Sequence, residues 1–132
     1  MAHAHSIQGT VQKSAIIRNL ASAITDRMGL NTQKGLIIIR FSDILYCEAM
    51  SNYCRLHLRD GSSYMASRTL KHVHACLPQT EFIRTHQSFV VRIDEVSGIH
   101  HELTLRNGKQ IPVARSQRTA LTKLFLNQLC VI

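Results

Sequence analysis

Residues 82–91 read Phe-Ile-Arg-Thr-His-Gln-Ser-Phe-Val-Val, and this stretch indicates both the fold and the surface that the fold carries. Five consecutive polar side chains lie between two apolar ends. The apolar ends are typical of short buried strands, and the polar middle is typical of an exposed connection between them. A hairpin of this kind would present Arg, His and Gln side by side, and Arg and Gln can read guanine and adenine edges.

The strand-rich pattern continues on both sides of this stretch. Strands are predicted over residues 36–40, 44–50, 53–58, 63–66, 82–85, 89–93, 99–105 and 110–113. Asp60-Gly61 and Asn107-Gly108 are hairpin turn signals. A short helix is predicted from Leu70 to Leu77, where Pro78 closes it, and a last helix is predicted to be capped by Ser116. The sequence therefore predicts a mainly β fold of antiparallel sheets with short helices.

The first 29 residues have a different character. Residues 1–13 are expected to be a disordered, tag-like leader, and residues 14–29 are expected to form an amphipathic helix or linker that stops at Gly29. The apolar stripe of that helix consists of Ile16, Ile17, Leu20, Ala21, Ile24 and Met28. The helix could pack on the domain, pair with a second copy, or lead to another domain. The main domain is expected over residues 35–130.

Composition narrows the class of partner. The 132 residues are enough for one domain, and 16 Lys and Arg against 8 Asp and Glu give a formal charge of +8. No acidic residue occurs from Leu103 to Ile132. Such a stretch suggests nucleic acid or an anionic membrane surface, although a solvated basic face has the same composition. No signal peptide or membrane-length apolar run is visible, so a cytoplasmic location without membrane contact is expected.

Three polar segments lie at the ends of predicted elements, where binding residues concentrate on a rigid scaffold. They are Met50 to Arg55, Arg84 to Ser88, and Ala114 to Arg118. If the last helix starts in the third segment, Arg115 and Arg118 share a face beside backbone N–H groups that can bind phosphate. Each segment alone is more often an ordinary solvated loop, but three of them on a basic chain favour nucleic-acid recognition.

Metal binding and catalysis are the competing interpretations. His72, His74 and Cys76 are ligand types, and His100-His101 could add to them, but on a helix His74 points away from the other two. No Cys-x₂-Cys pair frames a structural zinc site, so we expect no metal and no cofactor. A Cys54–His86 nucleophile pair lacks an orienting group and an oxyanion element, so we expect no enzymatic activity. The cysteines are expected to be free thiols of a reducing compartment.

Four pieces of the chain, in order, resemble the LytTR family of bacterial DNA-binding domains. They are Asp43 to Ala49 followed by Asn52-Tyr53, Gly61 followed by Ser67-Arg68-Thr69-Leu70, Phe82 to Val91, and Leu105 to Arg115. The resemblance covers about Gly35 to Leu126, and the pieces are specific jointly because their order and spacing agree.

The resemblance implies an elongated fold of small antiparallel sheets and sequence-specific binding of double-stranded DNA as a transcription regulator. Loops would enter successive major grooves, and the domain would bind tandem or repeated sites as a homodimer, often behind a receiver domain or with a sensor partner. The base-reading positions correspond to Asn52, Tyr53, Cys54, Gln87 and Arg115. Neighbouring candidates that would touch phosphate or brace the loops are Arg84, His86, Ser88, Ser116 and Arg118.

Three residues depart from the family pattern. Arg92 stands where Asn is common, Ala114 where Ser is usual, and Gln87 where Arg or Asn is commoner. The Gln87 departure affects which DNA sequence is expected as the target. Arg92 changes a structural hydrogen bond that the asparagine would make. No receiver precedes the domain in this sequence, so we expect either a removed receiver or a stand-alone regulator. The alternative is a protein-interaction module that uses the N-terminal helix, with the basic loops contacting an acidic partner.

Overall fold

The computed structural model describes residues 25–132, which fall into two units that meet between Arg40 and Phe41. The described part of the first unit is an antiparallel hairpin of β1 (Arg27–Thr32) and β2 (Gly35–Arg40). Its turn is fixed by Thr32, whose hydroxyl donates to the Gly35 carbonyl (2.8 Å) and accepts from the Lys34 N–H (3.2 Å). Gly35 takes φ 114°, a conformation that favours glycine.

Strand β1 corrects part of the expected N-terminal helix. Residues 27–29, which the helical stripe and the Gly29 stop assigned to that helix, pair instead with β2. Met28 fits the helical stripe, but Met28 and Leu30 also fit strand alternation, and pairing with the β-branched strand β2 decides between the two. The expected leader and the remainder of the expected helix, up to residue 24, lie outside the described residues.

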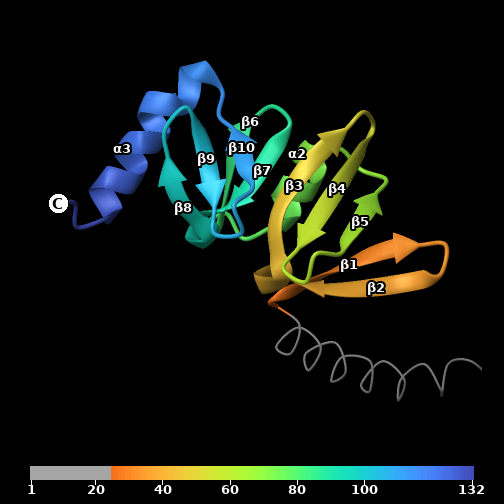
Figure 1. Cartoon of the computed structure of the whole chain (residues 1–132). Helices are drawn as coiled ribbons and strands as arrows, with labels where there is room; N and C mark the ends of the chain where they lie inside the picture. Colours follow the sequence, from red (N-terminus) through yellow and green to blue (C-terminus); the bar gives the residue numbers. More distant parts are fainter. Residues whose placement is uncertain (1–24) are drawn as a thin grey trace, which may run out of the picture. The chain divides into compact units, whose positions relative to one another are not determined.

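The second unit contains a five-stranded antiparallel sheet in the order β5-β4-β3-β7-β6 (Figure 1). Its strands are β3 (Ile44–Met50), β4 (Tyr53–Leu58), β5 (Ser63–Ala66), β6 (Phe82–His86) and β7 (Phe89–Arg92). Helix α2 (Leu70–Cys76) packs against this sheet and begins at Thr69, whose hydroxyl accepts the His72 N–H. These strands and this helix agree closely with the sequence predictions.

A second, three-stranded antiparallel sheet has the order β10-β9-β8. Its strands are β8 (Val96–Ile99), β9 (Glu102–Leu105) and β10 (Gln110–Pro112). The sequence predicted one strand over 99–105, but a turn at His100-His101 divides it, because the His100 N–H bonds the Glu102 carbonyl (3.0 Å). Histidine is not a turn-forming signal, so the division was missed. The described residues thus form ten strands, more than the seven or eight expected.

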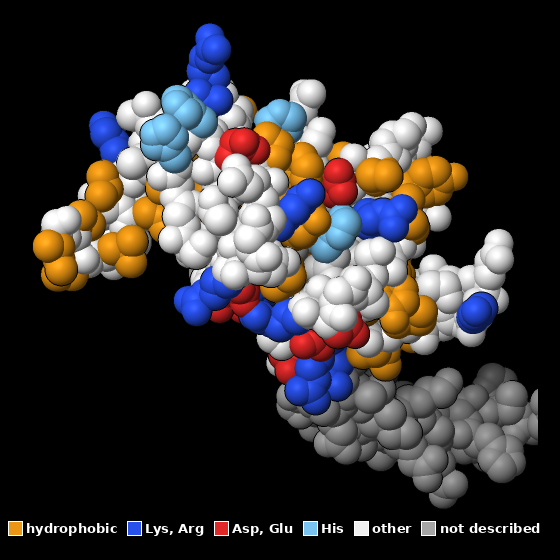
Figure 2. Space-filling view, in the orientation of Figure 1, with side chains coloured by type: hydrophobic (Ala, Val, Ile, Leu, Met, Phe, Trp, Pro, Cys, Tyr) orange, Lys and Arg blue, Asp and Glu red, His pale blue; other side chains and the backbone are white. Residues whose placement is uncertain are grey.

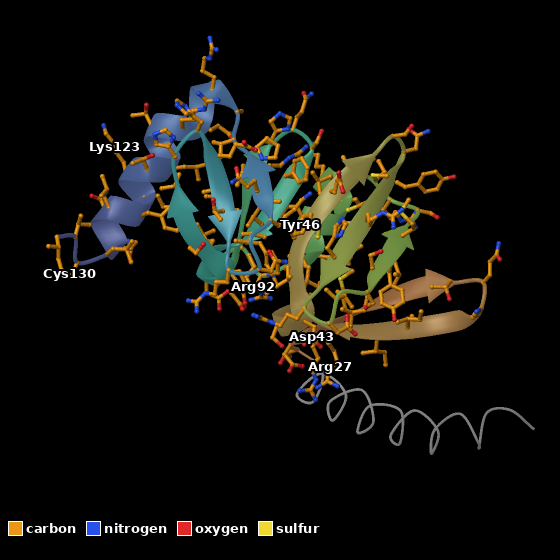
Figure 3. The ribbon with its side chains drawn as sticks, in the orientation of Figure 1. Arg27, Asp43, Tyr46, Arg92, Lys123 and Cys130 are labelled. Atoms are coloured by element: carbon orange, nitrogen blue, oxygen red, sulfur yellow. The ribbon has the colours of Figure 1, made fainter. Side chains whose placement is uncertain are left out.

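The core of the second unit lies where the two sheets meet. Tyr46 and Val91 of the large sheet pack with Leu103 and Ile111 of the small one, and Leu121 of α3 (Arg118–Gln128) joins them. Figure 3 shows Tyr46 between the two sheets. The mainly β architecture of small antiparallel sheets is therefore confirmed. No helix in residues 25–132 is long and apolar enough to cross a membrane.

Arg92 ties the end of β7 to the start of β3. Its side chain is only 2% exposed, and it donates from Nε to the Ile44 carbonyl (2.8 Å) and from Nη2 to the Phe41 carbonyl. Nη1 contacts the Glu81 carboxylate (3.2 Å), and the guanidinium lies 4.5 Å from the Phe82 ring centroid. Figure 3 shows Arg92 beside the η1 turn (Phe41–Asp43). A buried charge is tolerated because carbonyls and a carboxylate satisfy it.

We expect Arg92→Met to lower the free energy of unfolding by about 2–4 kcal/mol, because two buried carbonyls lose their donor. Urea denaturation monitored by circular dichroism measures the change. The control is Arg68→Met, at an exposed arginine, which should cost no more than about 0.5 kcal/mol. Equal stability of the two variants would show that Arg92 does not tie the strands together.

Candidate nucleic-acid interface

Three turns of the second unit lie along one edge, joined by two backbone hydrogen bonds. The Ala49 N–H donates to the Ser88 carbonyl (2.8 Å), which links the end of β3 to the β6–β7 turn. The Ala114 N–H donates to the Thr85 carbonyl (2.9 Å), which links the end of β6 to the segment that precedes α3. Figure 1 shows the three turns at the top of the view. The three polar segments of the sequence therefore come together.

The first turn joins β3 to β4 and presents Asn52. Met50 pairs with Tyr53, so only Ser51 and Asn52 form the loop. Ser51 has φ 60°, in the left-handed region that a two-residue hairpin loop requires at its first position. Asn52 is exposed and Tyr53 is 49% exposed, so both side chains are accessible from outside.

Cys54 does not belong to this accessible surface, contrary to the prediction. Its side chain is fully buried because it follows Tyr53 on a strand, and successive side chains of a strand point to opposite faces. It lies beside the buried Cys47, whose pKa is raised well above its usual range by the hydrogen bond to Cys54 and by burial. Cys54 therefore supports the strand and cannot touch a base directly.

The β6–β7 turn is held by its own polar side chains. Arg84 donates from Nε to the His86 carbonyl (3.2 Å) and from Nη2 to the Gln87 carbonyl (2.5 Å). His86 Nδ1 accepts the Ser88 N–H (3.1 Å). The Gln87 side chain remains exposed at the tip. Arg84 and His86 thus shape the turn, and Gln87 is the residue that the turn presents.

Thr85 is a residue of this site that the sequence did not single out. A β-bulge between Arg84 and His86 takes it out of the pairing with β7. Its buried hydroxyl donates to the Pro112 carbonyl (3.2 Å), and its own carbonyl accepts the Ala114 N–H. Thr85 therefore fixes the third turn relative to the second. No sequence signal identifies a bulge inside a polar run.

The third turn differs from its prediction. Residues 115–117 form a 3₁₀ turn, η3 (Arg115–Gln117), closed by the bond from the Gln117 N–H to the Ala114 carbonyl (2.8 Å). Helix α3 begins only at Arg118, and its N-cap is Gln117, so Ser116 does not cap it. The Arg118 N–H donates to the Arg115 carbonyl, so the two arginines are one 3₁₀ turn apart, in the turn that leads into α3 and not inside the helix itself. Arg115 and Ser116 are exposed, and Arg118 Nη1 lies 3.4 Å from His101 Nδ1.

The charge on this edge is not neutralised within the second unit. Among residues 41–132, no salt bridge uses Arg84, Arg115 or Arg118. The nearby Glu48 carboxylate bonds His57 Nε2 (3.1 Å), and burial of the His57 ring lowers its pKa. Figure 2 shows Lys, Arg and His side chains projecting above β8, β9 and the start of α3. Within residues 25–132, no cluster of ligand-type side chains could hold a metal ion.

The family model of the LytTr DNA-binding domain matches residues 34–126 of the chain. The chain belongs to the LytTr DNA-binding domain family. It is thus a DNA-binding domain. The resemblance read from the four sequence motifs is confirmed.

Individual relatives support this membership. The sensory transduction protein LytT of Bacillus subtilis (strain 168) is 30% identical over 105 residues, 75% of this chain and 43% of that protein. LytT of Bacillus anthracis is 25% identical over 106 residues, 75% of this chain and 42% of that protein. The chain thus spans less than half the length of these relatives.

A solved structure has the same fold. It is the LytTr domain of a protein described as a methyl-accepting/DNA response regulator from Bacillus cereus. The TM-score is 0.65 at 26% sequence identity, covering 76% of this chain and 96% of that one.

We expect Arg84→Lys to weaken DNA binding nearly as much as Arg84→Ala, because lysine keeps the charge but cannot bond two carbonyls at once. Affinity would be measured by fluorescence anisotropy at fixed salt, with circular dichroism to verify folding. A phosphate contact would behave differently, since Arg84→Lys would then retain most of the affinity. Restoration of binding by lysine would therefore refute the bracing role.

Proposed function

We propose that the domain binds double-stranded DNA sequence-specifically and regulates transcription, reading base edges through loops without a catalytic step. The observation that carries this proposal is the row of three hydrogen-bonded turns that expose Asn52, Gln87 and Arg115 on one edge. Each side chain is of a type that pairs with bases, and each backbone is held by neighbouring strands. Residues fixed in this way can discriminate bases without first being ordered.

The groove that suits these turns is the major groove. It is about 12 Å wide and displays a distinct pattern for each base pair. Arg115 would bond the O6 and N7 atoms of guanine in bidentate fashion, and Gln87 would bond an adenine edge. Asn52 and Tyr53 would read the groove entered by the first turn. Because the turns lie in a row, neighbouring turns would enter successive grooves.

A second set of side chains would hold the DNA backbone and keep the turns in register. Arg118 lies beside His101 at the start of α3, and its charge has no carboxylate partner in the second unit. Ser88, Ser116 and His86 lie next to the reading residues and would bond phosphate or support the turns. Contacts of this kind supply affinity and orientation but carry little sequence information.

The wider role follows from the relatives and is part of the proposal. The relatives are sensory transduction proteins and a response regulator, and the chain spans less than half of the sensory transduction proteins. We infer that this domain is the output part of a two-component system, controlled by a receiver domain or a sensor partner. On repeated DNA sites it would act as a homodimer, because two linked domains bind adjacent sites with higher avidity.

Arg115→Ala is expected to weaken binding to the preferred duplex by about 1–3 kcal/mol and to relax the base preference at one position. Selection from a random duplex pool, followed by titration of the selected sites, measures both effects. A uniform loss over all duplexes would mean that Arg115 contacts phosphate and reads no base.

The matched control for Arg115 is Arg106→Ala. Arg106 is also exposed, but its N–H bonds the Glu95 carbonyl beyond the far end of β7, away from the three turns. The Arg106→Ala substitution removes the same charge as Arg115→Ala, but at the opposite end of the second unit. The base preference of the domain should therefore stay unchanged. Altered preference in Arg106→Ala would contradict the position of the reading edge.

We expect Arg118→Gln to reduce affinity for all duplexes alike and to lower the steepness of the salt dependence. Each neutralised phosphate contributes about −0.9 to the slope of log K against log salt on duplex DNA. The variant should therefore lose about one unit of slope, measured by anisotropy at several salt concentrations. A wild-type affinity that is independent of salt, or binding to an acidic protein but not to duplex DNA, would contradict the proposed function.

A further inference from the structure

The β1–β2 hairpin has one buried and one exposed apolar face. Leu30 and Ile39 are buried, with 7% and 4% of their surface exposed. Leu36 and Ile38, which alternate with the buried side chains along β2, are 62% and 61% exposed. Two large apolar side chains side by side on a two-stranded hairpin indicate a surface that another element covers.

The strand opposite offers these side chains little cover. Ile38 pairs with Gly29, which has no side chain, and Leu36 pairs with Asn31. Leu36 leans over the glycine, since a Cβ placed on Gly29 would lie 3.0 Å from Leu36 Cδ1. The face is therefore an apolar surface made by the Leu36 and Ile38 side chains of β2.

We propose that the apolar stripe of residues 16–24 of the same chain covers this face. The stripe consists of Ile16, Ile17, Leu20, Ala21 and Ile24. It ends directly before the described turn at Thr25-Asp26, and this turn immediately precedes β1. The Asp26 carboxylate accepts a hydrogen bond from Arg27 Nε (2.9 Å) at this turn. A chain that turns here can run back along the hairpin.

The dimensions of the stripe and of the face agree. At a helical rise of 1.5 Å per residue, Ile16 to Ile24 spans roughly 12 Å. Ile38 and Leu36 are two residues apart on β2, which is roughly 7 Å along the strand. Ile38 lies opposite Gly29, which is two residues from the start of β1. The face is therefore close to the turn that connects the stripe to β1.

The small size of the face favours the same chain over a second copy. Two exposed side chains are far fewer than the roughly 20–30 residues that each partner contributes to a stable protein–protein interface. A segment tethered two residues away has an effective concentration in the millimolar range and needs no large interface.

Disulfide trapping tests this proposal. The full chain would carry Cys76→Ser and Cys130→Ser, which remove the two exposed thiols and leave the buried Cys47 and Cys54. In this background Leu20→Cys is combined with Ile38→Cys, and the control combines Arg18→Cys with Ile38→Cys. The chain segments that the two disulfides would close, residues 20–38 and 18–38, have nearly the same length. Chain entropy alone would therefore make the two disulfides form nearly equally. Each pair is equilibrated with oxidised and reduced glutathione, and mass spectrometry separates intrachain from interchain products.

We expect the equilibrium constant for the intrachain disulfide to be at least about tenfold larger for the Leu20–Ile38 pair than for the Arg18 control. At helical spacing, position 18 falls on the face opposite the apolar stripe. Equal formation by both pairs would overturn the proposal, since it would indicate an undocked segment. Predominantly interchain products would also overturn it and would assign the face to a second copy.

Discussion

The relative positions of the three turns depend on the two backbone hydrogen bonds that connect them to the β6–β7 turn. One bond joins Ser88 to Ala49 and the other joins Thr85 to Ala114, so this turn is the middle member of the row. The second bond exists because a β-bulge turns Thr85 away from β7 and toward the segment after β10. A bulge re-aims a strand locally, and here it connects the two sheets at the edge that we propose as the DNA-binding edge.

The opposite end of β7 is fixed by a different kind of interaction. Arg92 is buried and bonds the carbonyls of Phe41 and Ile44, which lie before and within the start of β3. A shorter polar side chain such as asparagine, with its single amide, could not reach two carbonyls and a carboxylate together. With Arg92 at one end and the hydrogen-bonded turns at the other, β3 and β7 are held along their whole length, and the edge rests on a rigid frame.

Most strands could be predicted because alternating apolar residues and turn pairs such as Asn107-Gly108 report local structure directly. The failures have specific causes. Met28 fits both helical and strand spacing, and only pairing with β2 decides between them. Strand alternation with the outward-facing Tyr53 indicates that Cys54 is buried, whereas the family resemblance placed Cys54 among the base-reading residues. The Thr85 bulge and the 3₁₀ turn at Arg115 depend on contacts between distant residues, which no local pattern reveals.

The polar run of residues 84–88 therefore divides into two functions. Arg84, Thr85 and His86 use their hydrogen-bonding groups inside the turn, and Gln87 keeps its side chain free. Under the proposed function, a substitution at position 87 would change which base is favoured and leave the hydrogen bonds inside the turn intact. Substitutions at positions 84–86 alter the frame and so affect every contact of the edge. Under the proposed function, target preference would therefore vary independently of folding, because the base-reading residue and the residues that hold the turn are different.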